Sequence, residues 1–360
     1  MIEIVAAGPL TTVQDLGRPG RQSQGIGHSG AADRPSLRLA NRLVGNPESA
    51  AGLEATLGGL VVRFSGARTV AVTGASCPLR LDDRGVDMNS PLHVLAGQTL
   101  HIGPAVRRLR TYVAVSGGVA VPEVAGSRST DLLSGLGPEP LRSGDRLPLG
   151  RGAGAVTAVD HAPQPLPDEH PVLRVTPGPR DDWFTAEALA DLFGSEYEMT
   201  IDSNRVALRL SGPPLRRATD RELPSEPLVC GAIQVPPDGQ PVLFLADHPV
   251  TGGYPVIGVV VDEDIPLAAQ CRPGQRLRFR RNTVLVARQR FGTASRFTAP
   301  AAARRDTPRS RPGPPSRTAS RAGVACRPPA PSPATRCASR ARCRAARTAG
   351  RMRAAAAASR

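Results

Sequence analysis

Glycine and proline interrupt this sequence so often that long regular elements have little room to form. Each occurs 37 times among the 360 residues, together about one residue in five. Glycine weakens helices and strands, and proline breaks helix interiors and central strands. The pattern therefore favours short strands joined by tight turns over a long helical bundle, in one large or two medium-sized domains.

The basic charge is confined to the C-terminal end of the chain. The formal net charge is +15, and all 46 basic residues are arginine. Residues 1–292 contain 30 arginines and 30 acidic residues, whereas residues 293–360 contain 16 arginines and one acidic residue. The body is therefore neutral, which argues against a nucleic-acid-binding body.

The segment from Thr293 onward has the composition of a disordered polymer. It contains 20 alanines, 16 arginines and 9 prolines but no leucine or isoleucine. Because it cannot bury enough apolar surface to offset the entropy of ordering, we expect disorder over residues 291–360. Two interpretations stay open: a basic tail that binds nucleic acid or acidic partners non-specifically, or a reading-frame artefact in a GC-rich gene. The complete absence of lysine fits GC-rich coding.

Targeting and metal-binding signals are missing from the sequence. The segment after Met1 has no basic region followed by an apolar run, and no stretch reaches 18 apolar residues. The six cysteines form neither a CxxC pair nor a Cys/His metal spacing. We therefore expect reduced thiols, a cytoplasmic location, no membrane partner and no metal site built from such a motif.

Short strands are predicted throughout the body. Segments rich in β-branched residues or alternating in polarity end at Gly, Asp or Pro, as strands do. They are 61–64, 69–72, 111–115, 205–210, 242–245 and 256–261. A glycine turn that leads into a short alternating strand occurs three times, at 96–102, 143–149 and 273–279. Such units are typical of barrels with tight corners.

Two helices are predicted between these strands. The first follows Asp33, an N-cap residue, has Pro35 in its first turn and stops at Gly45. The second lies near residues 183–193 and stops at Gly194.

A polar stretch rich in glycine and proline, residues 151–171, is the best linker candidate. We therefore predict one β-rich unit at 1–165, a second at 166–290 and the disordered tail at 291–360.

Several polar clusters adjoin glycines. Gly17 permits a positive φ, which lets a ligand approach the backbone, while Asp15 and Arg18 either contact that ligand or pair with each other. Ser29 lacks a surrounding G-x-S-x-G, so a hydrolase triad is not indicated. Arg205 and Arg221 can hold a carboxylate or phosphate, or belong to a solvated rim of cross-strand pairs.

The segment after Asp247 contains a Gly-Gly turn at a predicted strand end, which can form a nest for an anion or amide. The chain has no G-x-x-x-x-G-K-[ST] motif, so an ATP site here is not a P-loop.

A series of short motifs runs in one order over roughly residues 4–280. It comprises Thr12-Val13-Gln14-Asp15 with Gly17-Arg18, Ser29-Gly30 with Asp33, residues 40–46 with Leu53-Glu54, Val115-Ser116-Gly117-Gly118, Gly126-Ser127 with Ser129-Thr130-Asp131-Leu132, Ser203-Asn204-Arg205, Asp220-Arg221-Glu222-Leu223, residues 231–236 and Thr251-Gly252-Gly253-Tyr254-Pro255. The set resembles the family of the 5-oxoprolinase C subunit, also described as the biotin-dependent carboxyltransferase or allophanate hydrolase subunit 2 family.

The resemblance implies a mainly β fold of two cyclophilin-like β-barrels with a few short helices. It also implies a complex with the B subunit of 5-oxoprolinase, the nearest partner, and with the A subunit. This complex converts 5-oxo-L-proline, ATP and water to L-glutamate, ADP and phosphate, with ATP, accompanied by Mg²⁺, as co-substrate. Phosphorylating the lactam oxygen creates a leaving group, and such a site needs hydrogen-bond donors for phosphate oxygens.

On this basis we predict two sets of site residues. The catalytic set is Asp15, Arg18, Arg205, Asp220, Arg221, Glu222 and Asp247. The substrate- or nucleotide-binding set is Thr12, Gln14, Gly17, Ser29, Gly30, Ser203, Asn204, Gln234, Thr251, Gly252, Gly253 and Tyr254. Two segments, His248-Pro249-Val250 and Val206-Ala207-Leu208, depart from the family pattern and can alter the pocket.

Two other functions stay open within the resemblance. One is the carboxyltransferase component of a urea-carboxylase- or allophanate-hydrolase-like system, with biotin on a partner, because this chain has no lysine to be biotinylated. The other is a regulatory partner of a histidine-kinase inhibitor, which binds a protein similar to the B subunit.

Overall fold

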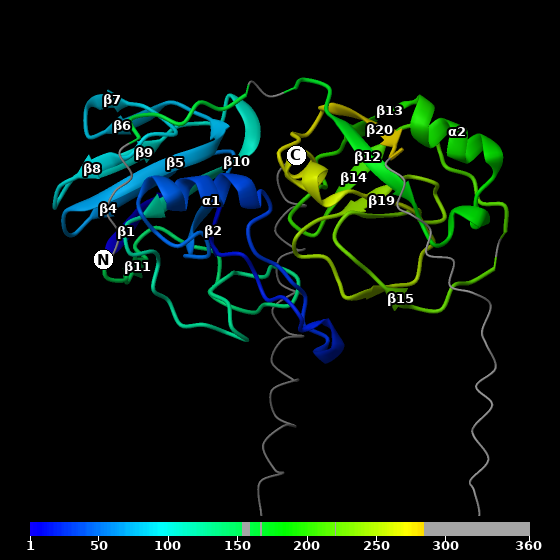
Figure 1. Ribbon diagram of the computed structural model, residues 1–360, viewed down its shortest axis with the longest axis horizontal. Coiled ribbons are helices and arrows are strands. Elements are labelled where there is room, and N and C mark those ends of the chain that lie inside the picture. Colours follow the sequence, from blue (N-terminus) through cyan, green and yellow to red (C-terminus); the bar gives the residue numbers. More distant parts are fainter. Residues whose placement is uncertain (153–158, 166–167, 220, 284–360) are drawn as a thin grey trace, which may run out of the picture. The chain divides into compact units, whose positions relative to one another are not determined.

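Strands dominate the part of the chain that the computed structural model describes, residues 1–152, 159–165, 168–219 and 221–283 (Figure 1). The predicted mainly β fold with a few short helices is confirmed. The predicted disordered tail at 291–360 and parts of the predicted linker lie outside the described residues.

The strands up to residue 147 form two sheets around one core. The six-stranded sheet has the order β11-β1-β4-β9-β6-β7, and the five-stranded sheet has the order β2-β3-β10-β5-β8. Their bounds are β1 Ile2–Ala7, β2 Leu10–Gln14, β3 Gly52–Thr56, β4 Leu60–Phe64, β5 Arg68–Ser76, β6 Leu79–Leu81, β7 Arg84–Val86, β8 Leu92–Val94, β9 Thr99–Ile102, β10 Arg107–Val115 and β11 Arg146–Leu147. Alternate residues of β4, such as Val62, point inward and join Val13 and Val113 of the other sheet in the core.

The strands from residue 172 onward close into a barrel in the order β12-β19-β16-β17-β14-β13-β20. Their bounds are β12 Val172–Pro177, β13 Glu196–Met199, β14 Ala207–Ser211, β16 Ala232–Gln234, β17 Val242–Phe244, β19 Val256–Val260 and β20 Arg276–Arg281. Inside the barrel the rings of Tyr197 and Phe279 pack with centroids 5.7 Å apart. A separate two-stranded sheet pairs β15 Glu226–Pro227 with β18 Thr251–Gly252.

The three predicted glycine turns are confirmed. Gly97, Gly144 and Gly274 have φ values of 88°, 95° and 81°, which an L-residue rarely adopts. Each turn leads directly into a strand, β9, β11 and β20 respectively.

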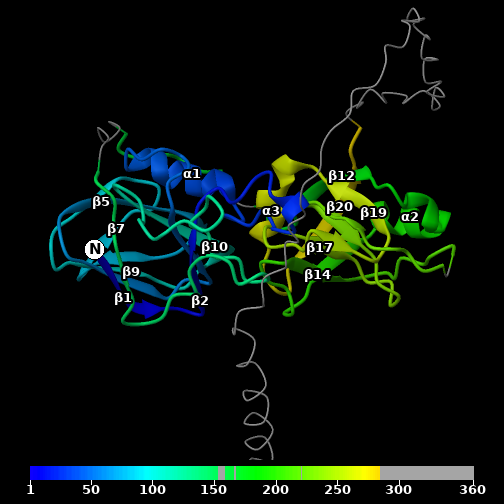
Figure 2. The same ribbon diagram turned by 90° about the horizontal axis from the view of Figure 1, so that it is seen from below.

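The first predicted helix is also confirmed. Helix α1, Arg34–Leu43, begins after Asp33, whose carboxylate accepts a hydrogen bond from the backbone N–H of Ser36 at 3.0 Å. Its apolar face packs on β5 and β10 (Figure 2).

The second predicted helix starts later than expected. Its first turn is a separate 3-10 turn, η2 Asp181–Trp183, and Thr185 then caps α2, Ala186–Gly194. In the described residues the structure adds three short helical elements that the sequence did not predict: α3 Ile265–Ala269 and the 3-10 turns η1 Gln22–Gln24 and η3 Asp262–Asp264. None of the helices in the described segments is long and apolar enough to cross a membrane. The domain boundary between 165 and 166 stays a prediction.

Candidate functional site

Arg205, which precedes β14, connects the two groups of strands through a buried ion-pair network. Its Nε and Nη2 donate to the carboxylate of Asp247 at 2.9 and 3.0 Å, and its Nη1 donates to Glu54 on β3. Nη2 also donates to the carbonyl oxygen of Gly30 at 2.7 Å. Because Arg205, Asp247 and Glu54 are each 1% exposed, an incoming ligand finds these charges already enclosed.

Glu54 receives further donors from the first group of strands. Its Oε2 accepts from the hydroxyl of Tyr112 on β10 at 2.8 Å and from the backbone N–H of Ala32 at 3.0 Å. The Nε of Arg110 lies 3.5 Å from its Oε1. This second arginine balances the charge, so the network holds two guanidinium groups and two carboxylates.

Asp247 is held in the same way by loops of the first half. Its Oδ1 accepts from the hydroxyl of Ser29 at 2.7 Å, and its Oδ2 accepts from the backbone N–H of Leu132 at 3.2 Å. Ser29 is fully buried and has φ 51°, a left-handed conformation that surrounding contacts must fix.

The pKa values of this network indicate a structural role. Burial by itself lowers the pKa of Arg205, but the carboxylates of Asp247 and Glu54 outweigh it and raise the pKa above the ordinary arginine value. Burial, and then the charge of Glu54, raises the pKa of the Tyr112 hydroxyl well above 10. Since both groups keep one protonation state near neutral pH, neither is suited to proton transfer.

Asp15, at the end of β2, organises a second buried cluster. Its carboxylate accepts hydrogen bonds from the hydroxyls of Ser127 and Ser129 at 2.6 Å and from the backbone N–H groups of Gly17 and Arg128 at 2.8 and 2.6 Å. With four donors and 8% exposure, this carboxylate fixes the loop after β2 against the 127–131 segment.

Arg18 lies in the same cluster and is 1% exposed. Its Nε donates to the carbonyl of Val124 at 3.0 Å and its Nη2 to the carbonyl of Ser129, whereas its Nη1 is buried without a hydrogen-bond partner in the described residues. Burial lowers the pKa of Arg18, partly offset by the negative charges of Asp131 and Asp15. The Nη1 of Arg18 is therefore an unsatisfied donor enclosed in this cluster.

Two histidines lie next to these clusters. His248 is 4% exposed, and its Nδ1 must carry the proton because it contacts the carbonyl oxygen of Pro249 at 2.8 Å. Burial lowers the pKa values of both His248 and His28; for His28 the neighbouring Arg34 adds to the effect. Both imidazoles are therefore neutral at neutral pH.

An open pocket of about 700 Å³ lies on the outside of the barrel, and it is lined by the predicted residues Arg221, Glu222, Gly253 and Tyr254. Tyr254 is 45% exposed, and the guanidinium carbon of Arg217 lies 5.8 Å from the centre of its ring. This places a partly exposed aromatic ring and charged groups of both signs in one pocket.

The arginines of this pocket stack on aromatic faces and keep donors available. Arg221 lies over Trp183 at 5.1 Å from the ring centre, and no hydrogen-bond or ion-pair partner of its guanidinium occurs in the described segments. Arg217 donates from Nη2 to the carbonyl of Val235 at 2.5 Å, but its Nε is buried and unpartnered within those same segments. Stacking uses the face of a guanidinium and leaves its in-plane N–H groups free for a carboxylate or phosphate. We name the pocket that Arg217, Arg221 and Tyr254 line the arginine–aromatic pocket; Trp183 contacts Arg221 but is buried and does not line the pocket.

The remaining predicted residues lie on β2, in the turn before β14 and near the arginine–aromatic pocket. Thr12 and Gln14 are buried on β2, where the Gln14 amide donates to Thr12 and to the carbonyl of Thr130. Ser203 and Asn204 stabilise the turn before β14 through local hydrogen bonds.

Near the arginine–aromatic pocket, the Gln234 amide donates to the carbonyl of Tyr254 at 2.8 Å. Thr251 and Gly252 form β18, and a side chain at Gly252 would collide with Gln234. Asp220 lies outside the described residues.

The structure thus brings Asp15, Arg18, Ser29, Arg205 and Asp247 together, and places Arg221, Glu222 and Tyr254 in a separate pocket. The residues that the sequence reasoning did not select are Glu54, Tyr112, Ser127, Ser129, Thr130, Asp131, Trp183 and Arg217. The hydroxyl-rich run at 127–131 and the second arginine beside Arg216 were the available signals.

The described residues contain no group of three or more His, Cys, Asp or Glu side chains placed to hold a metal ion. The donor set of the arginine–aromatic pocket fits an anion rather than a cation. We therefore assign Mg²⁺ to no residue of this chain.

Fold and site together define a two-part β protein, and a pocket lined by arginine, acidic and aromatic side chains lies beside its closed barrel. The chain belongs to the family of the carboxyltransferase domain, subdomain A and B, whose model matches residues 24–281. It is 42% identical to the 5-oxoprolinase C subunit of Escherichia coli strain K12 over 282 residues, which is 78% of this chain and 90% of the relative. The 5-oxoprolinase C subunit of Haemophilus influenzae is 35% identical over the same shares of the two chains.

The solved structure of the K. lactis urea amidolyase is similar as well. It matches with a TM-score of 0.72 at 30% identity, covering 77% of this chain and 18% of that protein. This chain thus corresponds to one small part of the urea amidolyase, but to nearly the full length of the two bacterial relatives.

Proposed function

We propose that this chain is the C subunit of an ATP-dependent 5-oxoprolinase that works with the A and B subunits and cleaves 5-oxo-L-proline to L-glutamate. The observation that carries the proposal is the 42% identity over 90% of the E. coli relative. The family match begins after β1 and β2 and covers the other strands of the sheet pair and the whole barrel, so Arg205, Glu54, Asp247 and the arginine–aromatic pocket lie within the matched range.

The chemistry of this reaction calls for a site like the arginine–aromatic pocket. 5-Oxo-L-proline carries a carboxylate, and activation of its lactam by ATP places negative charge on transferred phosphate oxygens. The guanidinium groups of Arg217 and Arg221, which line the pocket, offer charge-assisted donors for either group. The rings of Trp183 and Tyr254 hold these guanidinium groups in fixed orientations, which reduces the entropy lost when an anion binds.

The buried network has a positioning role in this proposal. Arg205, Glu54 and Asp247 fix the loops at 29–32 and 130–132 against the barrel. Arg18 belongs to the same buried region, and its enclosed, unpartnered Nη1 adds positive charge there.

A second candidate is a carboxyltransferase that moves a carboxylate from carboxybiotin to a urea-like acceptor. The family description and the likeness to the K. lactis urea amidolyase favour it. Since this chain contains no lysine, biotin would belong to a partner.

The test is reconstitution from purified components. We expect glutamate and phosphate to form from 5-oxo-L-proline and ATP only when this chain and the A and B subunits are all present. If a stable complex with the B subunit forms without turnover, the 5-oxoprolinase assignment is wrong. Urea-dependent loss of carboxylate from a carboxybiotin carrier would then identify the second candidate, and binding without either reaction would indicate a regulatory partner.

A further inference from the structure

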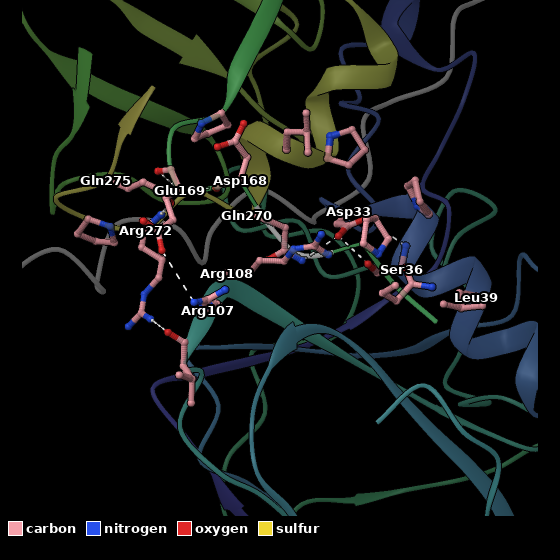
Figure 3. A pocket seen from close by; sticks show the side chains of 18 of the residues that line it. Asp33, Ser36, Leu39, Arg107, Arg108, Asp168, Glu169, Gln270, Arg272 and Gln275 are labelled. Carbon is pink, nitrogen blue, oxygen red and sulfur yellow. Dashed lines mark hydrogen bonds and ion pairs between the residues drawn. The ribbon is translucent and has the colours of Figure 1, made fainter. Parts of the chain in front are cut away.

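A cavity of about 850 Å³ lies away from the arginine–aromatic pocket, between the start of α1, the start of β10, the residues before β12 and the residues around α3 (Figure 3). Its walls are largely aliphatic, because Pro35, Pro171, Pro266, Pro273 and Leu267 line it. No aromatic side chain occurs among the described lining residues, so the cavity offers no ring on which a nucleobase would stack.

The floor of the cavity is formed by Gln270, whose side-chain hydrogen-bonding groups all have partners already. Gln270, 6% exposed, donates from Nε2 to Asp33 at 2.8 Å and to the carbonyl of Arg110 at 2.9 Å. Its Oε1 accepts from the backbone N–H groups of Leu109 and Arg110. The floor is therefore fixed in place and has no hydrogen-bonding capacity left on Gln270 for a ligand.

Arg108 supplies the positive charge that the floor lacks. The register of β10 against β5 shifts between Arg107 and Thr111, and within this bulge Arg108 has φ 64°. Bulges redirect a side chain, and a left-handed conformation at a non-glycine residue persists only where surrounding structure fixes it. Arg108 is half-buried and lines the cavity, and its side chain makes no hydrogen bond or ion pair within the described segments.

The other charged groups at the rim are already engaged, and Arg42 donates to the carboxylate of Glu48 at 2.8 Å. Arg272 donates to the carbonyl of Val106 at 2.7 Å, and Arg107 lies 3.9 Å from the carboxylate of Glu169. Asp168 accepts from the backbone N–H of His170 at 3.0 Å. Arg108 is therefore the cation in this cavity that a ligand can neutralise without breaking a described contact.

We propose that this cavity binds a small carboxylic acid with an aliphatic body. The carboxylate pairs with the Arg108 guanidinium, and the aliphatic part contacts the proline rings and Leu267. This site is separate from the one in the proposed function, and its occupancy stabilises the folded chain by mass action.

The test uses Arg108→Gly, because glycine accepts a positive φ and the variant should fold at least as well as the parent chain. Hexanoate binding to the full chain is measured by calorimetry and by the rise in Tm. We expect the hexanoate Kd to increase at least about tenfold in Arg108→Gly, to recover in part in Arg108→Lys and to stay unchanged in Arg84→Ala, which removes an exposed arginine from the β6–β7 hairpin.

Two comparison probes separate the charge from the aliphatic part. 1-Hexanol, which lacks the carboxylate, should bind the parent chain and Arg108→Gly equally weakly. The proposal is overturned if the parent chain does not bind hexanoate, or if Arg108→Gly binds it as the parent chain does. Binding of inorganic phosphate as tight as that of hexanoate would overturn the assignment of an aliphatic ligand.

Discussion

The buried network around Arg205 and the arginine–aromatic pocket around Arg221 are both built on arginines, but they differ in how many of the guanidinium donors already have a partner. Arg205 is 1% exposed and donates to two carboxylates and a carbonyl, whereas Arg221 is exposed and is held by the face of Trp183. A buried charge with all its partners in place contributes to structure, and an ordered charge with free donors can bind. The two regions show that the environment of an arginine, and not its neighbours in sequence, decides whether it stabilises the structure or can bind a ligand.

A substitution at Arg205 gives the most direct test of this difference between the two regions. Substitution Arg205→Met leaves Asp247 and Glu54 buried with too little positive charge. We expect the free energy of unfolding to fall by about 3–5 kcal/mol, measured by urea denaturation. Arg221→Met should change it by less than about 0.5 kcal/mol, because the side chain is exposed. Similar losses in the two variants would contradict the distinction between the regions.

The second buried cluster can be tested through Asp15. Asp15→Asn places an amide N–H₂ among four donors that now converge on a carboxylate. We expect a loss of about 2–4 kcal/mol in the free energy of unfolding, since buried donors lose their charged acceptor. Asp83→Asn, at a fully exposed carboxylate paired with Arg80, serves as the matched control and should stay within about 0.5 kcal/mol of the parent chain. An Asp15→Asn chain as stable as this control would show that Asp15 does not stabilise the fold.

The turns, many of the strands and the cap of α1 could be predicted from the sequence because their signals are local, whereas the two-barrel fold followed from the family resemblance. Gly97, Gly144 and Gly274 lie a few residues before the strands they introduce, and Asp33 caps α1 within four residues. The pairing of charges is not local: Arg205 and Glu54 are 151 residues apart, and Ser29 and Asp247 are 218 apart.

Composition does not specify which arginine meets which carboxylate across such separations. The sequence therefore identified Arg205 and Arg221 as equivalent anion-binding candidates, and only burial separates them. Arg217 was not predicted for the same reason. Its place in the pocket depends on the ring of Tyr254, which is 37 positions away along the chain but 5.8 Å away in space.

The pocket side of the comparison predicts a loss of activity without a loss of stability. In the reconstituted complex we expect Arg217→Ala and Arg221→Ala each to reduce kcat/KM for 5-oxo-L-proline by about 10- to 100-fold, the effect of one charge-assisted hydrogen bond. Arg84→Ala, exposed on the β6–β7 hairpin, is the matched control and should keep full activity. Full activity in both pocket variants would mean that the arginine–aromatic pocket does not bind the reacting anions.

The smallest expected effect concerns the pH dependence of stability at the edge of the buried network. Burial lowers the pKa of His248 below its ordinary value of about 6.5, so the folded chain binds fewer protons than the unfolded chain in the window below that value. The contribution of His248 is fully present above this window and is lost progressively as the pH falls through it, because the unfolded state takes up the proton first. Asp247 and Asp131 oppose the shift without reversing it.

Urea denaturation at about pH 7.5 and about pH 5.5 measures this contribution. We expect the parent chain to lose more stability between the two values than His248→Gln does, and the double variant His28→Gln, His248→Gln to lose least, since burial lowers the pKa of His28 as well. Acidic groups contribute equally to all three chains, so the difference between their losses isolates the imidazoles. Equal losses in the three chains would show that the histidines titrate alike in the folded and unfolded states. Burial beside Arg205 and Asp247 would then have no effect on their pKa values.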